Sequence, residues 1–169
     1  MKKFNFLMLL AIGLLAGTQS FAQLAIDKGT KFVNLGLSLG GYSYFRGSGL
    51  GLNAALDVGV ARNITVGGVA GYRTYGSGVT SFDIGARGSY HFNELLNLST
   101  DKADLYAGVG LSYYRLTYGD NYISSIASYG TTYIPIHIGG RYFFSENLGG
   151  FAELGSTLAA LKLGLTLKF

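Results

Sequence analysis

The sequence has no cysteine, no tryptophan and a single proline, and few of its residues are charged. Without cysteine, neither a disulfide framework nor a lipid anchor on an N-terminal cysteine can form. Charged residues make up 13% of the chain, whereas an average soluble domain has about 25%. The chain is therefore poorly suited to a fully solvated surface, and noncovalent contacts alone must stabilise its fold.

Long apolar runs are also scarce. One covers residues 4–15, after two lysines and before a group of small residues. This pattern predicts a secretory signal peptide over residues 1–22, cleaved before Gln23. Beyond it, no apolar run approaches the roughly 20 residues of a membrane-spanning helix. If the exported chain enters a bilayer, it must do so as β-strands.

The remaining residues, 23–169, are predicted to form one domain, because no linker or shift in composition divides them. The formal net charge of the whole chain is +4, and the signal peptide contributes two of its lysines. So small a surplus does not point to nucleic acid as a partner.

What the sequence does have is glycine, 27 residues of it, within a pattern of alternation. Val33, Leu35 and Leu37, for example, alternate with asparagine and glycine, which is the period of a β-strand. The pattern recurs in eight segments: residues 31–44, 50–60, 64–73, 81–92, 105–113, 133–144, 152–155 and 161–169. We expect eight antiparallel strands.

The chemistry of the two faces predicts which one is outside. The polar face consists mostly of glycine, serine, threonine and asparagine, which suits the crowded lumen of a narrow barrel better than a solvated surface. The apolar face continues from strand to strand, as expected for a surface in contact with lipid. Since an open edge would leave backbone groups unpaired in lipid, the sheet must close. The sequence thus predicts an all-β, eight-stranded, up-and-down transmembrane β-barrel.

Aromatic residues concentrate near the ends of the predicted strands. One group includes Tyr42, Tyr44, Phe45, Tyr72, Tyr75, Tyr113, Tyr114, Tyr118, Tyr122, Tyr129 and Tyr133, and the other includes Tyr90, Phe92, Tyr142, Phe144 and Phe169. Two such girdles are typical of a barrel that crosses both membrane interfaces.

With its leader, its eight alternating segments and the final strand over residues 161–169, the chain resembles the small outer-membrane barrels of the OmpA/OmpX-like superfamily. It looks closest to the outer-membrane β-barrel domain proteins of Bacteroidetes. The resemblance implies an outer-membrane location in a Gram-negative cell envelope and a periplasmic C-terminus. It also implies that Phe169 is the assembly signal read by the barrel assembly machinery.

The charged residues on the polar face are predicted to form an ion network that fills the lumen. By parity, this set is Asp57, Arg73, Asp83, Arg87, His137, Arg141, Glu153 and Lys162. A tight turn at residues 157–158 would place Glu153 directly opposite Lys162, and we expect Arg73 to pair with Asp83. The alternative is a gated polar path or a small-ligand site in the lumen.

Nothing in the sequence predicts catalysis. A serine, His137 and Glu153 could be neighbours, but the spacing does not require it. His91 and His137 lack the companions of a zinc site, and the glycines follow strand parity and form no phosphate loop. We therefore expect no enzyme activity, no cofactor and no metal.

The expected role is that of a structural outer-membrane protein or an accessory subunit of an envelope complex. Its expected partners are outer-membrane lipid, the barrel assembly machinery and, for an accessory subunit, another envelope protein. The alternative function is a narrow porin-like channel or a small-ligand-binding barrel. The longest periplasmic connection, residues 93–102, contains Leu95, Leu96 and Leu98. We expect these leucines to pack against the rim; the alternative is that they contact a partner.

Overall fold

The computed structural model describes residues 24–40, 50–75, 78–118, 128–156 and 160–169, so the predicted signal peptide lies outside it. The strands are β1 (Lys31–Leu39), β2 (Leu50–Ala61), β3 (Ile64–Tyr75), β4 (Val79–His91), β5 (Ala103–Thr117), β6 (Ser128–Tyr133), β7 (Ile136–Phe143), β8 (Leu148–Gly155) and β9 (Leu161–Lys168). Among these described residues, no helix is long and apolar enough to span a membrane.

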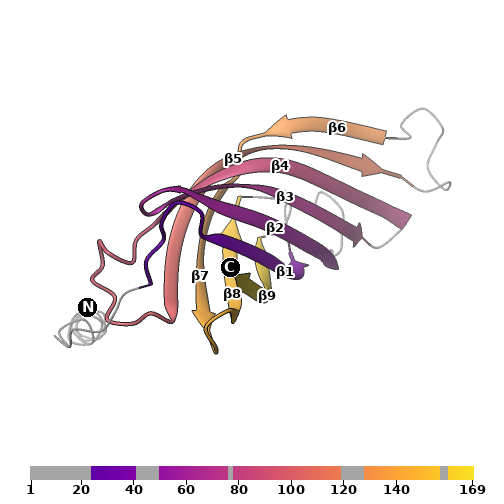
Figure 1. Cartoon of the computed structure of the whole chain (residues 1–169). Helices are drawn as coiled ribbons and strands as arrows, with labels where there is room; N and C mark the ends of the chain where they lie inside the picture. The colour runs from indigo at the N-terminus through magenta and orange to yellow at the C-terminus, as the bar shows by residue number, and fades with distance from the viewer. Residues whose placement is uncertain (1–23, 41–49, 76–77, 119–127, 157–159) are drawn as a thin grey trace, which may run out of the picture.

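The sheet closes on itself because β9 pairs with β1. Both β6 and β7 pair with β5 in a single register, in which Tyr133 lies opposite Ser112 and Ile136 lies opposite Val109. They are two halves of one strand, interrupted at Pro135, which has no N–H to donate to the ladder. The fold is therefore a closed antiparallel barrel of eight strands, as the sequence predicted. In Figure 1, β1–β6 fan across the upper wall and β7–β9 cross below them.

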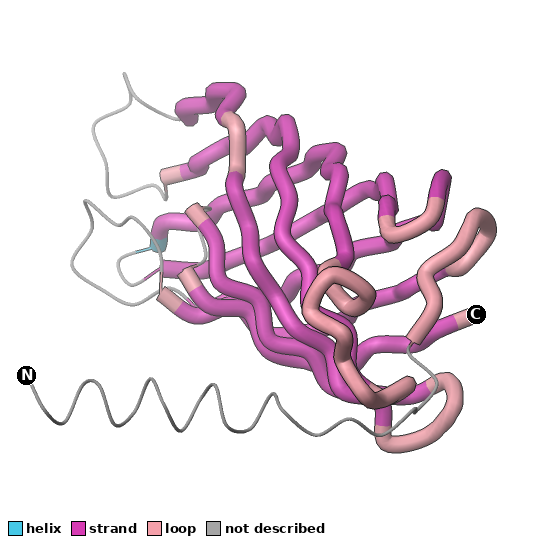
Figure 2. The backbone as a smooth tube through the Cα atoms, turned by 90° about the vertical axis from the view of Figure 1, so that its left-hand side faces the viewer, coloured by secondary structure: helices cyan, strands magenta, loops and turns pink. Residues whose placement is uncertain are grey.

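Side chains alternate between the outside and the lumen along each strand. Leu52, Val109 and Leu154 point outward and are 64%, 53% and 55% exposed. Inward residues such as Asn34 and Asp57 are buried. The molecule is thus polar inside and apolar outside, which is the reverse of a soluble barrel. The tube in Figure 2 shows the strands wrapped around this polar interior.

Several strand boundaries differ from the sequence prediction; β8, for example, begins at Leu148, four residues earlier than expected. The first strand, expected to continue to Tyr44, ends at Leu39, and residues 41–44 lie outside the described residues. The strand that contains β6 begins at Ser128, five residues earlier than expected, and β5 begins at Ala103, two residues earlier. The last difference matters for the lumen, because it adds Asp104 to the inward face.

The aromatic groups divide between the two faces of the barrel. Tyr72, Phe82 and Tyr113 point outward and are 46–50% exposed, as a girdle requires. Tyr75, in contrast, is buried inside, where its hydroxyl contacts Ser81. Tyr42, Tyr44, Phe45 and Tyr122 lie outside the described residues.

An apolar cap, which the sequence interpretation missed, closes the end of the barrel at which the described chain begins. Leu24 and Ile26 are 4% and 1% exposed and pack with Phe32 and Phe143. The Asn63 backbone N–H donates to the Ile26 carbonyl. The cap separates the charged lumen from solvent at this end.

Two facing glycines allow the first and last strands to approach at the seam. Gly36 lies opposite Gly164, and the ring of Phe151 covers both. A Cβ added at Gly164 would lie 2.8 Å from Phe151 Cε1 and would also overlap Gly36. We expect Gly164→Ala to destabilise the barrel by about 1–3 kcal/mol through overpacking.

Urea unfolding of the refolded protein measures this change. Gly68→Ala is the matched control, because its Cβ would meet no atom closer than the Gly85 carbonyl oxygen at 3.8 Å. Equal effects of the two substitutions would show that the seam is not specially constrained.

Candidate functional site in the barrel lumen

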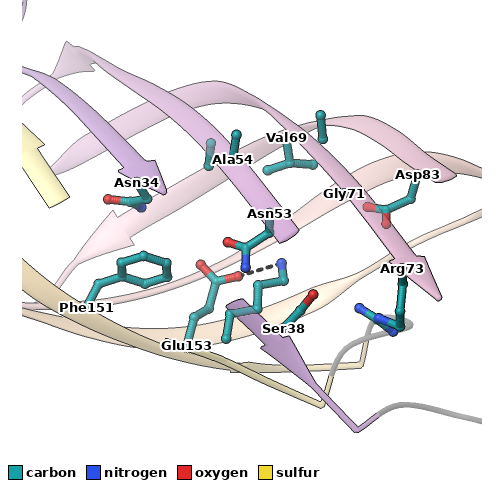
Figure 3. Close-up of a pocket in the computed structure, with 13 residues that line it drawn as sticks. Asn34, Ser38, Asn53, Ala54, Val69, Gly71, Arg73, Asp83, Phe151 and Glu153 are labelled. Atoms are coloured by element: carbon teal, nitrogen blue, oxygen red, sulfur yellow. Dashed lines mark hydrogen bonds and ion pairs between the residues drawn. The ribbon is translucent and has the colours of Figure 1, made fainter. Parts of the chain in front are cut away.

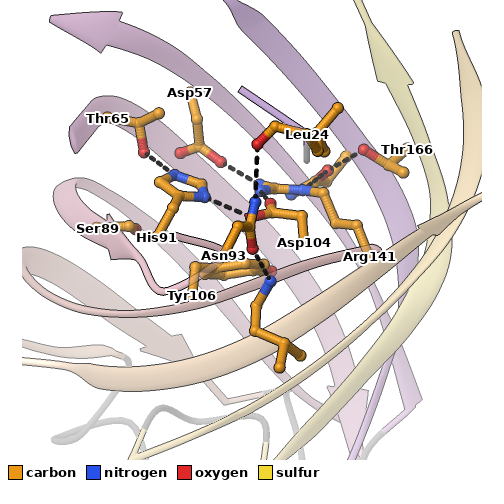
Figure 4. Close-up of polar contacts among 12 residues, drawn as sticks. Leu24, Asp57, Thr65, Ser89, His91, Asn93, Asp104, Tyr106, Arg141 and Thr166 are labelled. Carbon is orange, nitrogen blue, oxygen red and sulfur yellow. Dashed lines mark hydrogen bonds and ion pairs between the residues drawn. The ribbon is translucent and has the colours of Figure 1, made fainter. Parts of the chain in front are cut away.

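Asp57 on β2 is the centre of the lumen cluster. Arg87 on β4 binds it with two hydrogen bonds, from Nη2 to Oδ2 at 2.6 Å and from Nε to Oδ1 at 2.8 Å. Arg141 on β7 donates from Nη2 to the same Oδ2 at 2.8 Å. All three side chains are at least 94% buried. A single carboxylate thus ties together strands on opposite sides of the barrel (Figure 4).

Glu153 on β8 extends the cluster toward β9. It accepts from Arg87 Nη1 at 2.7 Å and from Lys162 Nζ at 2.9 Å. The Tyr106 hydroxyl also donates to it, at 3.1 Å. Glu153 lies directly opposite Lys162 in the β8–β9 ladder, so this predicted register is confirmed.

Arg141 connects the cluster to a second carboxylate, Asp104 on β5, through a contact of 2.6 Å. Its guanidinium lies between the rings of Phe32 and Tyr106, 4.3 and 4.2 Å from their centroids. This arrangement gives a buried cation both ionic partners and aromatic faces. The Arg141 guanidinium is therefore fixed in position and is not available to bind a ligand.

His91 lies between an acid and a hydroxyl. Its Nδ1 is 2.7 Å from Asp104 Oδ1, and its Nε2 is 3.0 Å from Thr65 Oγ1. The order of groups matches that of an acid–histidine–nucleophile triad. However, Thr65 is 1% exposed, and the other two side chains are fully buried. A substrate has no surface from which to reach the hydroxyl, so the geometry is that of a structural network.

The second histidine, His137, binds Ser89 over Gly108 of the intervening strand β5, with Nε2 2.8 Å from Oγ. Both side chains are buried. The sequence had raised a serine, His137 and Glu153 as possible neighbours. The histidine and a serine do meet, but no hydrogen bond joins His137 to Glu153 among the described residues, so the acid of a triad is not in place.

The expected pair of Arg73 and Asp83 does not form. The β3–β4 register places Arg73 opposite Ser81 and Asp83 opposite Gly71, because the hairpin closes with Tyr75 opposite Val79. A pair of Arg73 and Asp83 directly opposite each other would need a five-residue loop over residues 76–80, whereas β4 already begins at Val79, so the two charges lie diagonally. Arg73 Nη1 instead contacts the Gly40 carbonyl at 3.4 Å.

Five of the eight predicted charged residues thus form one ion cluster, namely Asp57, Arg87, Arg141, Glu153 and Lys162. The sequence interpretation missed Asp104 and Asn93. Asn93 joins the cluster by donating to Asp104 Oδ1 at 3.2 Å and to the Leu24 carbonyl at 3.2 Å. Parity could have identified Asp104, since it is two residues before the inward Tyr106.

A small cavity lies on the other side of the cluster from the apolar cap (Figure 3). Its volume is about 20 Å³, and Asn34, Asn53, Arg73 and Asp83 are among its lining residues. Asn34 Oδ1 accepts from Thr166 and Arg141, which turns its Nδ2 away from them, and that Nδ2 has no partner. A space of this size holds about one water molecule, so it is too small for an organic ligand.

No group of three or more potential metal ligands occurs in the part of the chain that the structure describes.

The connection between β4 and β5 projects from the capped end of the barrel. Arg62 Nη2 contacts Glu94 at 2.6 Å, and Asn63 Nδ2 donates to the same carboxylate at 2.8 Å. Leu95 and Leu96 are 67% and 46% exposed. The prediction that Leu95, Leu96 and Leu98 pack against the rim is wrong for the first two, because the loop is held at its polar residues and turns these two leucines outward. Leu98 is half-buried.

The hydrogen bonds from Arg62 and Asn63 lower the pKa of Glu94 below its ordinary value. These hydrogen bonds therefore stabilise the loop fully when the pH is above the ordinary pKa of a glutamate. Their contribution is lost as the pH falls through the lowered pKa of Glu94. We expect amide exchange in residues 92–98 to accelerate in this acidic range, beyond its intrinsic change with pH. Glu94→Gln should remove the extra acceleration, and an unchanged pH dependence in that variant would contradict the assignment.

Comparison with solved structures places this geometry among known folds. The N-terminal β-barrel domain of OprF from Pseudomonas aeruginosa is 17% identical, with a TM-score of 0.57, over 85% of this chain and 98% of that one. OprG from the same organism is 12% identical, with a TM-score of 0.60, over 85% and 97%. Neisserial surface protein A is 14% identical, with a TM-score of 0.56, over 83% and 96%.

The fold is that of the small eight-stranded outer-membrane barrels. No protein-family model and no curated protein matches the chain. At these identities the likeness concerns the fold alone, and the expected closeness to Bacteroidetes proteins stays a prediction.

Proposed function

We propose that the protein is a non-enzymatic integral outer-membrane barrel with a filled lumen, acting as a structural component or an accessory subunit of an envelope complex. The observation that carries this proposal is the ion cluster, in which Arg87 and Arg141 share Asp57 across the barrel. The cluster occupies the space through which a solute would pass.

The exterior supports a membrane location. Leu35, Leu111, Ile136 and Leu165 are 54–63% exposed, on different strands around the barrel. In water, a continuous apolar surface of this kind would drive aggregation, whereas in lipid it matches the solvent. Export through the leader and recognition of Phe169 during assembly belong to the same proposal. Phe169 is 67% exposed, hence accessible to a partner.

Conductance across planar bilayers tests the filled lumen. We expect the refolded protein to give no steady channels, because the cluster and the apolar cap both block the path. Steady channels whose ion selectivity changes in Glu153→Gln, but not in the exposed variant Arg62→Gln, would overturn the proposal. They would establish the alternative function, a narrow porin-like channel.

An accessory role requires a partner, for which the projecting leucines Leu95 and Leu96 are a candidate surface on the capped side. Affinity isolation from native membranes in mild detergent tests this part of the proposal. We expect a co-purifying envelope protein that is lost in a Leu95→Ser/Leu96→Ser variant. Recovery of the barrel always alone would reduce the proposal to a structural role.

A further inference from the structure

The lumen on the side away from the apolar cap contains buried polar atoms that the ion cluster does not satisfy. Among the described residues, three side-chain N–H groups there have no hydrogen-bond partner, namely Asn34 Nδ2, Asn53 Nδ2 and Arg73 Nε. Asn34 and Arg73 are 1% and 3% exposed. Buried donors are normally paired, because an unpaired one forfeits the hydrogen bond that it makes to water in the unfolded chain. These three N–H groups therefore need an acceptor.

The three donors converge on one space, because they come from neighbouring strands. Asn34 is on β1, Asn53 on β2 and Arg73 on β3, and all three line the small cavity of about 20 Å³ (Figure 3). One water molecule needs about 10–15 Å³. The cavity therefore has room for one molecule of the size of water.

A carboxylate on the cavity wall has acceptor capacity to spare. Asp83 on β4 lines the cavity, and no described residue donates a hydrogen bond to it. A Cβ at Gly71, the residue opposite, would overlap Asp83 Oδ1, so the glycine leaves the carboxylate its place beside the cavity. Glu153, the other carboxylate on the wall, already accepts from three donors. A molecule in the cavity can therefore accept from the amides and donate to Asp83.

The charges on the cavity wall favour a neutral occupant. Arg73 and Lys162 are matched by Asp83 and Glu153, so the wall has no net formal charge. An anion would meet two carboxylates, and a metal ion would face N–H groups that cannot ligate it. Water meets neither conflict, because it accepts and donates hydrogen bonds at the same time.

We propose that a single ordered water molecule binds in this cavity, accepts hydrogen bonds from the side-chain amides of Asn34 and Asn53, and donates one to Asp83. The two amides use both lone pairs of the water, and Arg73 interacts with Asp83 by charge alone. Because Asn34 Oδ1 accepts from Arg141, the water joins Asp83 to the ion cluster. The inference goes beyond the proposed function, which requires only that the lumen is filled.

Nuclear Overhauser effects between water and the asparagine side chains of the refolded protein test the proposal. Asn93 is the internal control, because it is fully buried and its Nδ2 donates to the Leu24 carbonyl and to Asp104 Oδ1. We expect cross-peaks from water to the amide protons of Asn34 and Asn53, and none to those of Asn93. Measurement in the rotating frame separates these effects from proton exchange.

A variant and a crystal soak identify the molecule that gives the signal. Ser38→Ala removes the hydroxyl among the described lining residues, and the cross-peaks should persist, since only a signal relayed through that hydroxyl would vanish. Diffraction from crystals soaked in bromide should show a density peak at the site without anomalous scattering.

Three results would overturn the proposal. The first is the loss of the cross-peaks at Asn34 or Asn53, in the protein itself or in Ser38→Ala. The second is an anomalous signal in the cavity, which would identify an anion. The third is an equal cross-peak at Asn93, which would show that water enters the whole lumen and is not held at one site.

Discussion

Replacing Asp57 with alanine is expected to lower the free energy of unfolding by about 3–5 kcal/mol, the usual effect of breaking a buried ion pair. The carboxylate neutralises both Arg87 and Arg141. Without it, the two buried guanidinium groups lose their shared carboxylate. Arg87 then keeps only Glu153 as an ionic partner, and Arg141 keeps only Asp104. Urea unfolding of the refolded barrel in lipid vesicles measures the loss.

A charge-balanced double variant separates the effect of charge from that of packing. In Asp57→Ala/Arg87→Met, the remaining pairs are Arg141 with Asp104 and Lys162 with Glu153. We expect this protein to be more stable than Asp57→Ala alone, because its two cations are balanced by two carboxylates, whereas in Asp57→Ala three cations share Glu153 and Asp104. If the double variant is the less stable of the two, the unpaired charge is not what destabilises the single one.

Removing the apolar cap should have the second-largest effect. Leu24→Ala and Ile26→Ala each delete buried methyl groups that contact Phe32 and Phe143, and substitutions of this kind cost about 2–5 kcal/mol. The cap also keeps water from His91 and Asp104, both fully buried. We therefore expect the double variant to be less stable and to exchange the backbone amide of His91 faster.

The matched control is Leu95→Ala/Leu96→Ala, which removes the same kind of side chain from the exposed loop. Surface changes of this type usually stay within about 0.5 kcal/mol. Equal destabilisation by the two double variants would mean that the segment around Leu24 does not form a cap in solution.

Parity along each strand determined the fold class and which side chains turn inward. All eight charged residues predicted from it lie on the inner face, because the period of a strand is two and one face was consistently apolar. Local spacing also placed Glu153 opposite Lys162, as the β8–β9 ladder has them. The same reasoning failed for Arg73 and Asp83, where the turn was placed one residue too far along the chain and the register shifted by two.

Only the tertiary structure decided which charges meet. Arg87 reaches Asp57 and Arg141 reaches both Asp57 and Asp104 from strands that are distant in sequence. Those contacts depend on closure of the sheet and on the stagger between its strands, neither of which leaves a mark in local periodicity. The cap at Leu24 also depends on contacts between segments that are distant in sequence. Alternation sets the face of a side chain, whereas its height in the barrel and its neighbour across the lumen follow from the register of the whole closed sheet.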